Sequence, residues 1–300
     1  MSIFLTPANE LRSGWKFALY IVFFLLIWFA TGLALSAFAM RRSDDVLQDR
    51  LFILALNEIG LLVPSIGAMW LTVRFVDHRP FRTFGIGFLP RWRSELLIGL
   101  AVAAGMLGLL IAGCYAFGYV NIQWSGGQVS VWILLATFSL LLLAAANEEL
   151  MFRGFPLQVL VDGVGKWPAT IGMSMLFGLI HLGNPNASLL GTANTVVAGI
   201  LLSLAYLRTR SLWMPYGIHV AWNVGLGFVF GFSLSGVDIA SLWTTGVAGS
   251  DLILGGDYGP EGGLLATFAF AVAALIVETY GSVNRDKTHP RSSAWGRHRK

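Results

Sequence analysis

Long apolar stretches recur along the whole chain. We count eight segments of roughly the 20-residue length that a helix needs to cross a bilayer. Inside hydrocarbon every backbone polar group must be satisfied internally, so only helices or closed barrels can span it. The pattern predicts an all-α polytopic membrane protein with about eight transmembrane helices. The segments lie at residues 17–40, 52–76, 95–119, 130–151, 168–183, 194–207, 212–233 and 262–281.

Composition agrees with a bilayer as the solvent. Charged residues make up 12% of the chain, about half of what soluble globular proteins carry. The basic residues are dispersed, so the sequence does not predict a nucleic-acid partner. The single cysteine, Cys114, can form neither an internal disulfide nor a multi-cysteine metal site, and we expect it to be a packing residue. The fifth and sixth segments are short, so a half-span or re-entrant pair is an alternative there.

The loops between the segments alternate in charge. Loops 120–129 and 184–193 are uncharged, loop 236–261 has acidic residues only, and loop 41–50 is mixed. Because Lys and Arg are enriched in cytoplasmic loops, both termini are predicted to be cytoplasmic, which an even number of spans satisfies. Basic residues occur before the first segment and after the second, fourth and sixth, at Arg12, Lys16, Arg74, Arg79, Arg82, Arg91, Arg93, Lys166, Arg208 and Arg210, and again after the eighth.

The chain is predicted to form one transmembrane domain, residues 1–283, followed by a basic, disordered cytoplasmic tail at 284–300. Residues 37–39 (AFA) resemble a signal-peptidase site. The apolar run before them is too long for a signal peptide, so we expect residues 1–39 to be retained as a span. Arg outnumbers Lys 16 to 4, which suits a GC-rich prokaryotic genome and hence a prokaryotic plasma membrane.

Ionisable side chains interrupt three of the apolar segments. Glu148, Glu149 and Arg153 occur in LLLLAAANEELMFRGF, His181 ends FGLIH, and HVAWN contains His219 and Asn223. Such groups are costly in hydrocarbon, and by default they mark a functional site. The loops that flank these segments place the side chains toward the middle to inner part of the bilayer, where they can converge. Convergence would create a polar intramembrane site.

The spacing within each motif is one helical turn. Glu149 with Arg153, and His219 with Asn223, are i,i+4 pairs on one helix face, and Phe177 precedes His181 by the same interval. Taken singly, these residues could also have a purely structural role. Glu149 and Arg153 could be only an ion pair, a lone histidine could be a hydrogen-bonding group between helices, and Glu58 could be an interhelical hydrogen-bonding group.

The ordered trio E-E-x-x-x-R, F-x-x-x-H and H-x-x-x-N resembles the CAAX prenyl protease and bacteriocin-processing family (CPBP, or Abi) of intramembrane endopeptidases. The resemblance covers about residues 130–230. It implies hydrolysis of a peptide bond in a membrane-associated peptide or protein. Glu148 would activate water with help from His181, and His219 and Asn223 would stabilise the oxyanion. Glu149 and Arg153 would support the base, and Phe177 could pack beneath His181.

Several alternatives remain open. No cofactor is favoured, but Glu148, His181 and His219 could be three zinc ligands with an open position for water. A proton-coupled transporter also has buried carboxylates and histidines, although the sequence has no evident internal repeat. A third alternative is a non-catalytic family member. The substrate could be a prenylated C-terminal peptide, a bacteriocin leader or another membrane protein, the prenylated one being disfavoured in a prokaryote.

Overall fold

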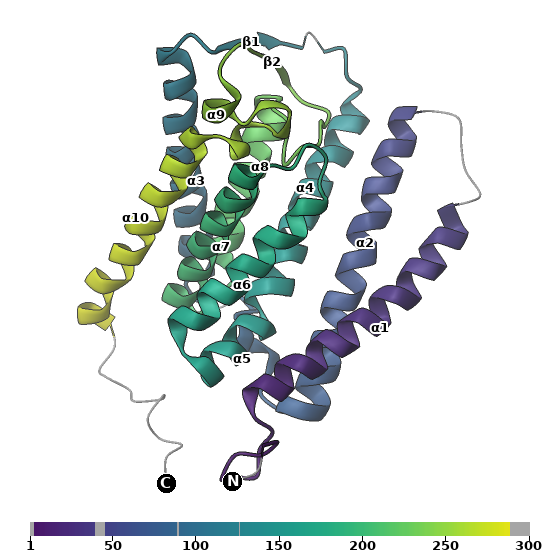
Figure 1. The fold of residues 1–300 in the computed structure, drawn as a ribbon, viewed down its shortest axis with the longest axis vertical. Helices are drawn as coiled ribbons and strands as arrows, with labels where there is room; N and C mark the ends of the chain where they lie inside the picture. Colours follow the sequence, from purple (N-terminus) through teal and green to yellow (C-terminus); the bar gives the residue numbers. More distant parts are fainter. Residues whose placement is uncertain (1–2, 40–45, 89, 126, 289–300) are drawn as a thin grey trace.

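The computed structural model describes residues 3–39, 46–88, 90–125 and 127–288, and most of them are helical (Figure 1). The predicted all-α class is confirmed. The long helices are α1 (Ser13–Ala39), α2 (Val46–Thr72, extended by a π-helical turn at Val73–Asp77), α3 (Trp92–Ala116), α4 (Val131–Arg153), α7 (Leu189–Thr209) and α10 (Leu264–Thr288). The shorter ones are α5 (Phe155–Val164), α6 (Lys166–Ile180), α8 (Trp213–Asn223, extended by a π-helical turn at Val224–Val229) and α9 (Asp251–Leu254).

Each of the eight predicted segments coincides with a helix. Within the described ranges, five helical stretches are long and apolar enough to cross a membrane: 13–39, 51–77, 92–116, 131–164 and 189–209. The described apolar part of α10, Leu264–Tyr280, is shorter, as are α6 with 15 residues and α8 with 11. These features identify an integral membrane protein. Residues 40–45 and 289–300 lie outside the described residues, and with them most of the predicted tail at 284–300. The second half of the predicted mixed loop 41–50 belongs to α2, which begins at Val46, and the first residues of the predicted tail belong to α10, which continues to Thr288.

Glycine allows α3 and α8 to pack very closely. A Cβ added at Gly99 would lie 2.3 Å from the carbonyl oxygen of Met214, and one at Gly217 would lie 2.6 Å from that of Leu96. Small residues are common where membrane helices approach closely, because dispersion then replaces the hydrophobic effect as the packing force. The main core cluster lies around this contact and includes Leu110, Ile218 and Trp222. The backbone of α8 is thereby fixed.

A cover of loops and short elements closes one end of the helix bundle, at the top of Figure 1. Strand β1 (Val120–Trp124) pairs antiparallel with β2 (Trp243–Val247), in the register Val120 to Val247 and Trp124 to Trp243. Helix α9 belongs to the same region. The sequence predicted loops here and no strands. We call residues 231–263 the cover segment.

The opposite end of the bundle carries ion pairs between helices. Asp77 accepts from Lys16 at 2.6 Å, and Arg79 bridges Asp77 at 2.6 Å and Asp162 at 2.9 Å. Partial burial opposes the charged guanidinium of Arg79, but the two carboxylates outweigh it and raise its pKa. These pairs join the start of α1, the end of α2 and the end of α5. Glu278 similarly joins α10 to Lys166 and Arg208.

Candidate functional site

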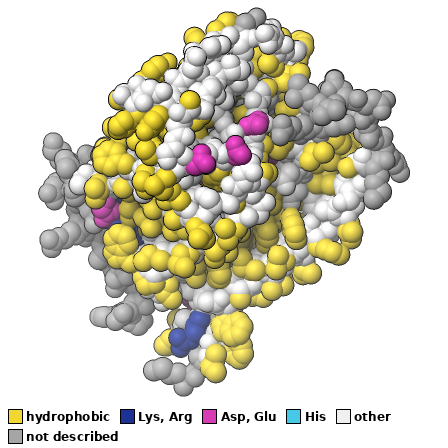
Figure 2. Space-filling view, turned by 45° about the horizontal axis from the view of Figure 1, so that its top comes forward, with side chains coloured by type: hydrophobic (Ala, Val, Ile, Leu, Met, Phe, Trp, Pro, Cys, Tyr) yellow, Lys and Arg dark blue, Asp and Glu magenta, His cyan; other side chains and the backbone are white. Residues whose placement is uncertain are grey.

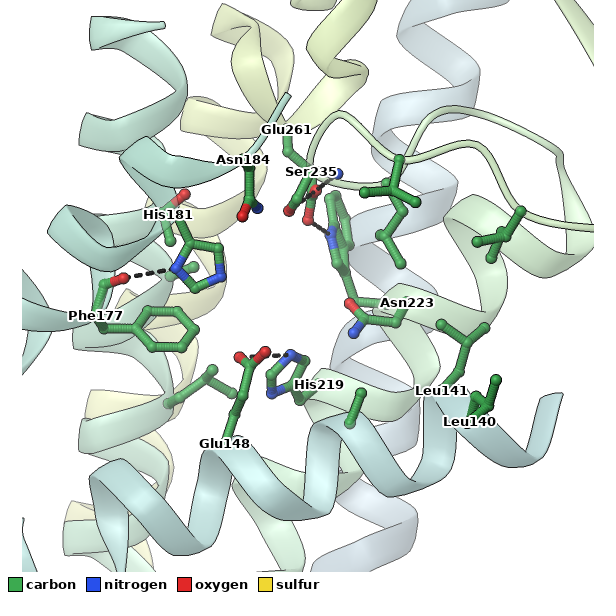
Figure 3. A pocket seen from close by; sticks show the side chains of 18 of the residues that line it. Leu140, Leu141, Glu148, Phe177, His181, Asn184, His219, Asn223, Ser235 and Glu261 are labelled. Carbon is green, nitrogen blue, oxygen red and sulfur yellow. Dashed lines mark hydrogen bonds and ion pairs between the residues drawn. The ribbon is translucent and has the colours of Figure 1, made fainter. Parts of the chain in front are cut away.

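A cavity of about 250 Å³ lies among α2, α4, α6, α7, α8 and the cover segment (Figure 3). Figure 3 shows Glu148 and His219 on one side, Phe177 and His181 on another, and Glu261 and Ser235 where the cover segment closes the cavity. Residues from all three sequence motifs therefore line one space. They do so although Glu148 and His219 are 71 positions apart.

The two adjacent glutamates have different environments. Glu148 points into the cavity and its side chain is 25% exposed, whereas that of Glu149 is 1% exposed and lies between helices. His219, on α8, contacts both of them. Its Nδ1 lies 2.9 Å from Glu149 Oε1, and its Nε2 lies 3.7 Å from Glu148 Oε2. A carboxylate on one ring nitrogen fixes the orientation and tautomer of an imidazole, so Glu149 directs Nε2 of His219 toward Glu148.

Arg153 supports this arrangement from beneath the cavity. Its side chain is 1% exposed, and its Nη1 donates to Glu149 Oε1 at 3.2 Å. Nη2 donates to the carbonyl oxygen of Gly199 on α7 at 3.4 Å, and the guanidinium lies 4.4 Å from the centre of the Phe177 ring. The i,i+4 ion pair expected from the sequence is present. It is extended by His219 into a three-residue array that the spacing alone did not reveal.

His181 occupies a different wall of the cavity. Its Nδ1 lies 2.6 Å from the carbonyl oxygen of Phe177, one turn earlier on α6, and the two rings are 4.7 Å apart. Phe177 also stands edge-on to His219 at 6.4 Å. The phenyl ring thus lies beside both histidines. In the part of the chain that the structure describes, no three His, Cys, Asp or Glu side chains are grouped so as to hold a metal ion.

Asn223 lies one turn after His219 on α8 and also lines the cavity. Its side chain is half-buried, and in Figure 3 it lies beyond His219, on the side away from Phe177. Both residues are therefore carried by the helix that Gly99 and Gly217 hold against α3. The residues of the three sequence motifs thus offer a substrate one carboxylate, two imidazoles and one amide.

Two further carboxylates line the cavity. Glu58 on α2 accepts a hydrogen bond from Asn147 Nδ2 at 3.4 Å, which confirms the predicted interhelical hydrogen bond. Glu261 in the cover segment accepts from Trp222 Nε1 at 2.8 Å and from the backbone and hydroxyl of Ser235, each at 2.7 Å. Glu261 has no recognisable signal in the sequence, because it lies in a loop without a spaced motif around it. Its role depends on a contact with a helix 39 residues earlier.

The residues that line the cavity from α4, α6 and α8 fall within the part of the chain that matches a family model. Residues 130–225 match the Rce1-like family model. The family is described as type II CAAX prenyl endopeptidase Rce1-like, and the match confirms the resemblance noted from the three motifs. The Rce1-like segment begins just before α4 and ends just after Asn223. Helices α1 to α3, most of the cover segment and α10 lie outside it.

Two curated relatives are similar to parts of this chain. The "Uncharacterized protein YyaK" of Bacillus subtilis is 30% identical over 190 residues, which are 61% of this chain and 63% of that protein. The "Uncharacterized 24.3 kDa protein" of Escherichia coli is 31% identical over 101 residues, 33% of this chain and 45% of that protein. The chain thus spans less than two thirds of either relative, and neither name states an activity.

Proposed function

We propose that this protein is an intramembrane endopeptidase that hydrolyses a peptide bond in the cavity between α4, α6 and α8. The observation that carries the proposal is that Glu148, His181, His219 and Asn223 all line one cavity and all lie within the Rce1-like segment. Ionisable side chains within membrane-spanning helices are energetically costly, and a functional role explains their presence.

In the proposed reaction, Glu148 is the general base. Its Oε2 is buried without a hydrogen bond from any described residue, so it is available to a water molecule. Glu148 takes one proton from this water while the water oxygen bonds to the carbonyl carbon of the substrate. The same proton then passes to the leaving nitrogen as the C–N bond breaks. General acid–base help of this kind contributes about 100- to 10,000-fold, and His181 assists from the opposite wall.

His219 and Asn223 are proposed to stabilise the oxyanion. Because Nδ1 donates to Glu149, Nε2 of His219 carries an N–H only when the ring is an imidazolium. In that form, Nε2 and the Asn223 amide are donors on one face of α8, and one such donor contributes roughly 3–4 kcal/mol to transition-state stabilisation. Glu149 keeps His219 in place through Nδ1. Arg153 neutralises the buried carboxylate of Glu149, and Phe177 packs against both histidines.

The test of the proposal is Glu148→Gln, which preserves shape and removes the proton acceptor. Hydrolysis of a membrane-peptide library by the purified variant should fall by at least ~100-fold, while its yield and melting temperature stay close to wild type. Glu10→Gln, at an exposed carboxylate outside the bundle, is the matched control and should retain activity. Hydrolysis at the wild-type rate in Glu148→Gln would refute the mechanism.

Zinc dependence is the alternative chemistry for the same protease. It would require Glu148, His181 and His219 to gather around one ion, and the described side chains form no such set. We therefore propose a mechanism that uses protein residues alone. Elemental analysis of wild type, His181→Ala, His219→Ala and Asn223→Ala tests the alternative. Stoichiometric zinc that both histidine variants lose and Asn223→Ala retains would establish a metalloprotease.

The proposed setting is a prokaryotic plasma membrane with both chain termini in the cytoplasm. The substrate is then a membrane-associated peptide or protein that reaches the cavity from the lipid. A transporter or a non-catalytic family member would both lack peptide hydrolysis, so the library assay distinguishes them from the proposed function.

A further inference from the structure

Glu58 is a carboxylate in the middle of an apolar helix that the proposed reaction does not use. It lies on α2, outside the Rce1-like segment, and is half-buried at the wall of the cavity. Asn147, which is fully buried, donates to its Oε2 at 3.4 Å and accepts from Ser65 Oγ at 3.1 Å. This chain of hydrogen bonds across α2 and α4 holds the Glu58 carboxylate at the cavity.

The charge of the cavity lining is one-sided. Three carboxylates line it, from Glu58, Glu148 and Glu261, and among the described lining residues there is no Lys or Arg. Arg153 is nearby but lies beneath the lining, where Glu149 and Gly199 engage it. Apart from the imidazoles of His181 and His219, a free C-terminal carboxylate of a substrate would therefore meet carboxylates and no Lys or Arg to bind it. A cationic side chain would meet a favourable field.

The three carboxylates differ in the hydrogen bonds that they already accept and in the roles proposed for them. Glu261 accepts three hydrogen bonds within the protein, and Glu148 is assigned to the reacting water. Glu58 accepts one long hydrogen bond from Asn147, and the Asn57 side chain is a second partner of its carboxylate. A carboxylate offers about four acceptor positions, so Glu58 has capacity for an incoming donor. Glu58 is the carboxylate that can pair with a substrate cation without giving up another role.

Glu58 also stands where the cavity reaches the surface between α2 and α4. The lining residues of this part are Leu51, Leu54 and Asn57 from α2 with Leu140 and Leu141 from α4, and Asn57 is exposed. The cover segment, which lines the same cavity, has four acidic residues, Asp238, Asp251, Asp257 and Glu261, and no Lys or Arg. Figure 2 shows acidic side chains on this end of the molecule. A cationic peptide is attracted to this end.

Resting on the proposed function, we infer that the substrate carries a Lys or Arg side chain close to the scissile bond, and that Glu58 is the specificity-determining residue that pairs with it. The pairing takes place in a partly desolvated site, where a close charge pair adds selectivity as well as affinity. Substrates with an acidic residue in the same position are rejected, because two carboxylates would face each other.

The inference is tested with peptides that are identical except for Lys, Gln or Glu at each position around the cleaved bond. For wild-type protein in detergent, kcat/KM should be about 10-fold higher for Lys than for Gln at one position, and lowest for Glu. Glu58→Gln, which can still accept from Asn147, should remove the difference between Lys and Gln. Glu58→Lys should reverse the order. Glu278→Gln, outside the cavity, is the matched control and should keep the wild-type ratios.

Equal kcat/KM for the three peptides with wild type, or unchanged ratios in Glu58→Gln, would refute the inference. Binding measurements distinguish failure of this inference from failure of the proposed function. In Glu148→Gln, labelled Lys peptide should bind about 10-fold more tightly than Gln peptide, and adding Glu58→Gln should abolish the difference. Charge-selective binding without any wild-type hydrolysis would refute the protease and retain the cation site, whereas hydrolysis without charge selectivity would do the reverse.

Discussion

At the scale of single residues, the two neighbouring glutamates of α4 lie in different environments. A rotation of about 100° per residue directs Glu148 to the cavity and Glu149 to the interior. Glu149 contacts Arg153 at 3.2 Å and His219 at 2.9 Å. Glu149 is thus suited to positioning His219, and Glu148, which faces the cavity, is suited to the proposed chemistry.

Removing one partner of the buried ion pair should destabilise the protein. Glu149→Gln or Arg153→Met leaves an uncompensated buried charge, which costs about 3–5 kcal/mol and should appear as a lower melting temperature in detergent. The loss of stability in the double variant should be smaller than the sum of the losses in the two single variants. A Glu149→Gln protein that is fully stable yet inactive would show instead that Glu149 takes part in catalysis.

Asn223→Ala should affect turnover more than binding. Loss of one oxyanion donor lowers kcat by roughly 100- to 1000-fold, and KM should change little because the interaction forms in the transition state. Steady-state kinetics on a single cleaved peptide measure both constants. Asn121→Ala, on the exposed β1 strand, is the control. A raised KM with normal kcat would mean that Asn223 binds the ground state only.

At the scale of elements, the cover segment is attached to the helix that carries two proposed catalytic residues. Glu261 accepts from Trp222 on α8 and from Ser235 in the cover. Its backbone carbonyl accepts from Asn194 on α7 at 2.7 Å, and burial, with the nearby Glu261 carboxylate adding to it, raises the pKa of Tyr258 in the same segment. One carboxylate therefore connects the cover segment to the cavity wall that α8 forms.

Glu261→Ala should loosen the cover while leaving the helices folded. Three donors lose a charged acceptor, and each such hydrogen bond contributes roughly 1.5–3 kcal/mol. Amide hydrogen exchange around residues 234–239 should then become faster by at least ~10-fold, with little change in α3. Asp257→Ala removes a carboxylate from the same segment and should leave the exchange rates as in wild type. Equal protection in both variants would contradict the attachment.

The contact between α3 and α8 should tolerate no added methyl group. Gly99→Ala would bring a Cβ to 2.3 Å from the Met214 carbonyl, so α8 must move or the protein must lose stability, at a cost of about 1–3 kcal/mol. Gly105→Ala, on the same helix with no atom within 4 Å of an added Cβ, is the matched control. We expect a lower melting temperature for Gly99→Ala alone. Equal melting temperatures would show that α8 can adjust freely.

At the scale of the whole molecule, the two ends differ in charge. The ion pairs of Lys16, Arg79 and Lys166 lie at the end where α1 begins and α10 ends, and the cover segment with its acidic residues lies at the other (Figures 1 and 2). The positive-inside rule predicts that the first end faces the cytoplasm.

Cysteine labelling tests this orientation. In a Cys114→Ser background, Ser250→Cys in the cover segment should react with a membrane-impermeant maleimide in intact cells. Ser94→Cys, exposed at the start of α3, should react only after lysis. The reverse pattern would place both termini outside the cytoplasm.

Hydropathy and charge in the sequence were sufficient to predict the helical class, the positions of all eight segments and three motifs of candidate site residues. These are properties of neighbouring residues and of a solvent that forces the backbone into helices. The contact of His219 with both glutamates, the Glu261 attachment and the β1–β2 pairing were not predictable in this way. They join residues 39 to more than 100 positions apart, and packing such as the Gly99–Gly217 approach decides which helix faces meet.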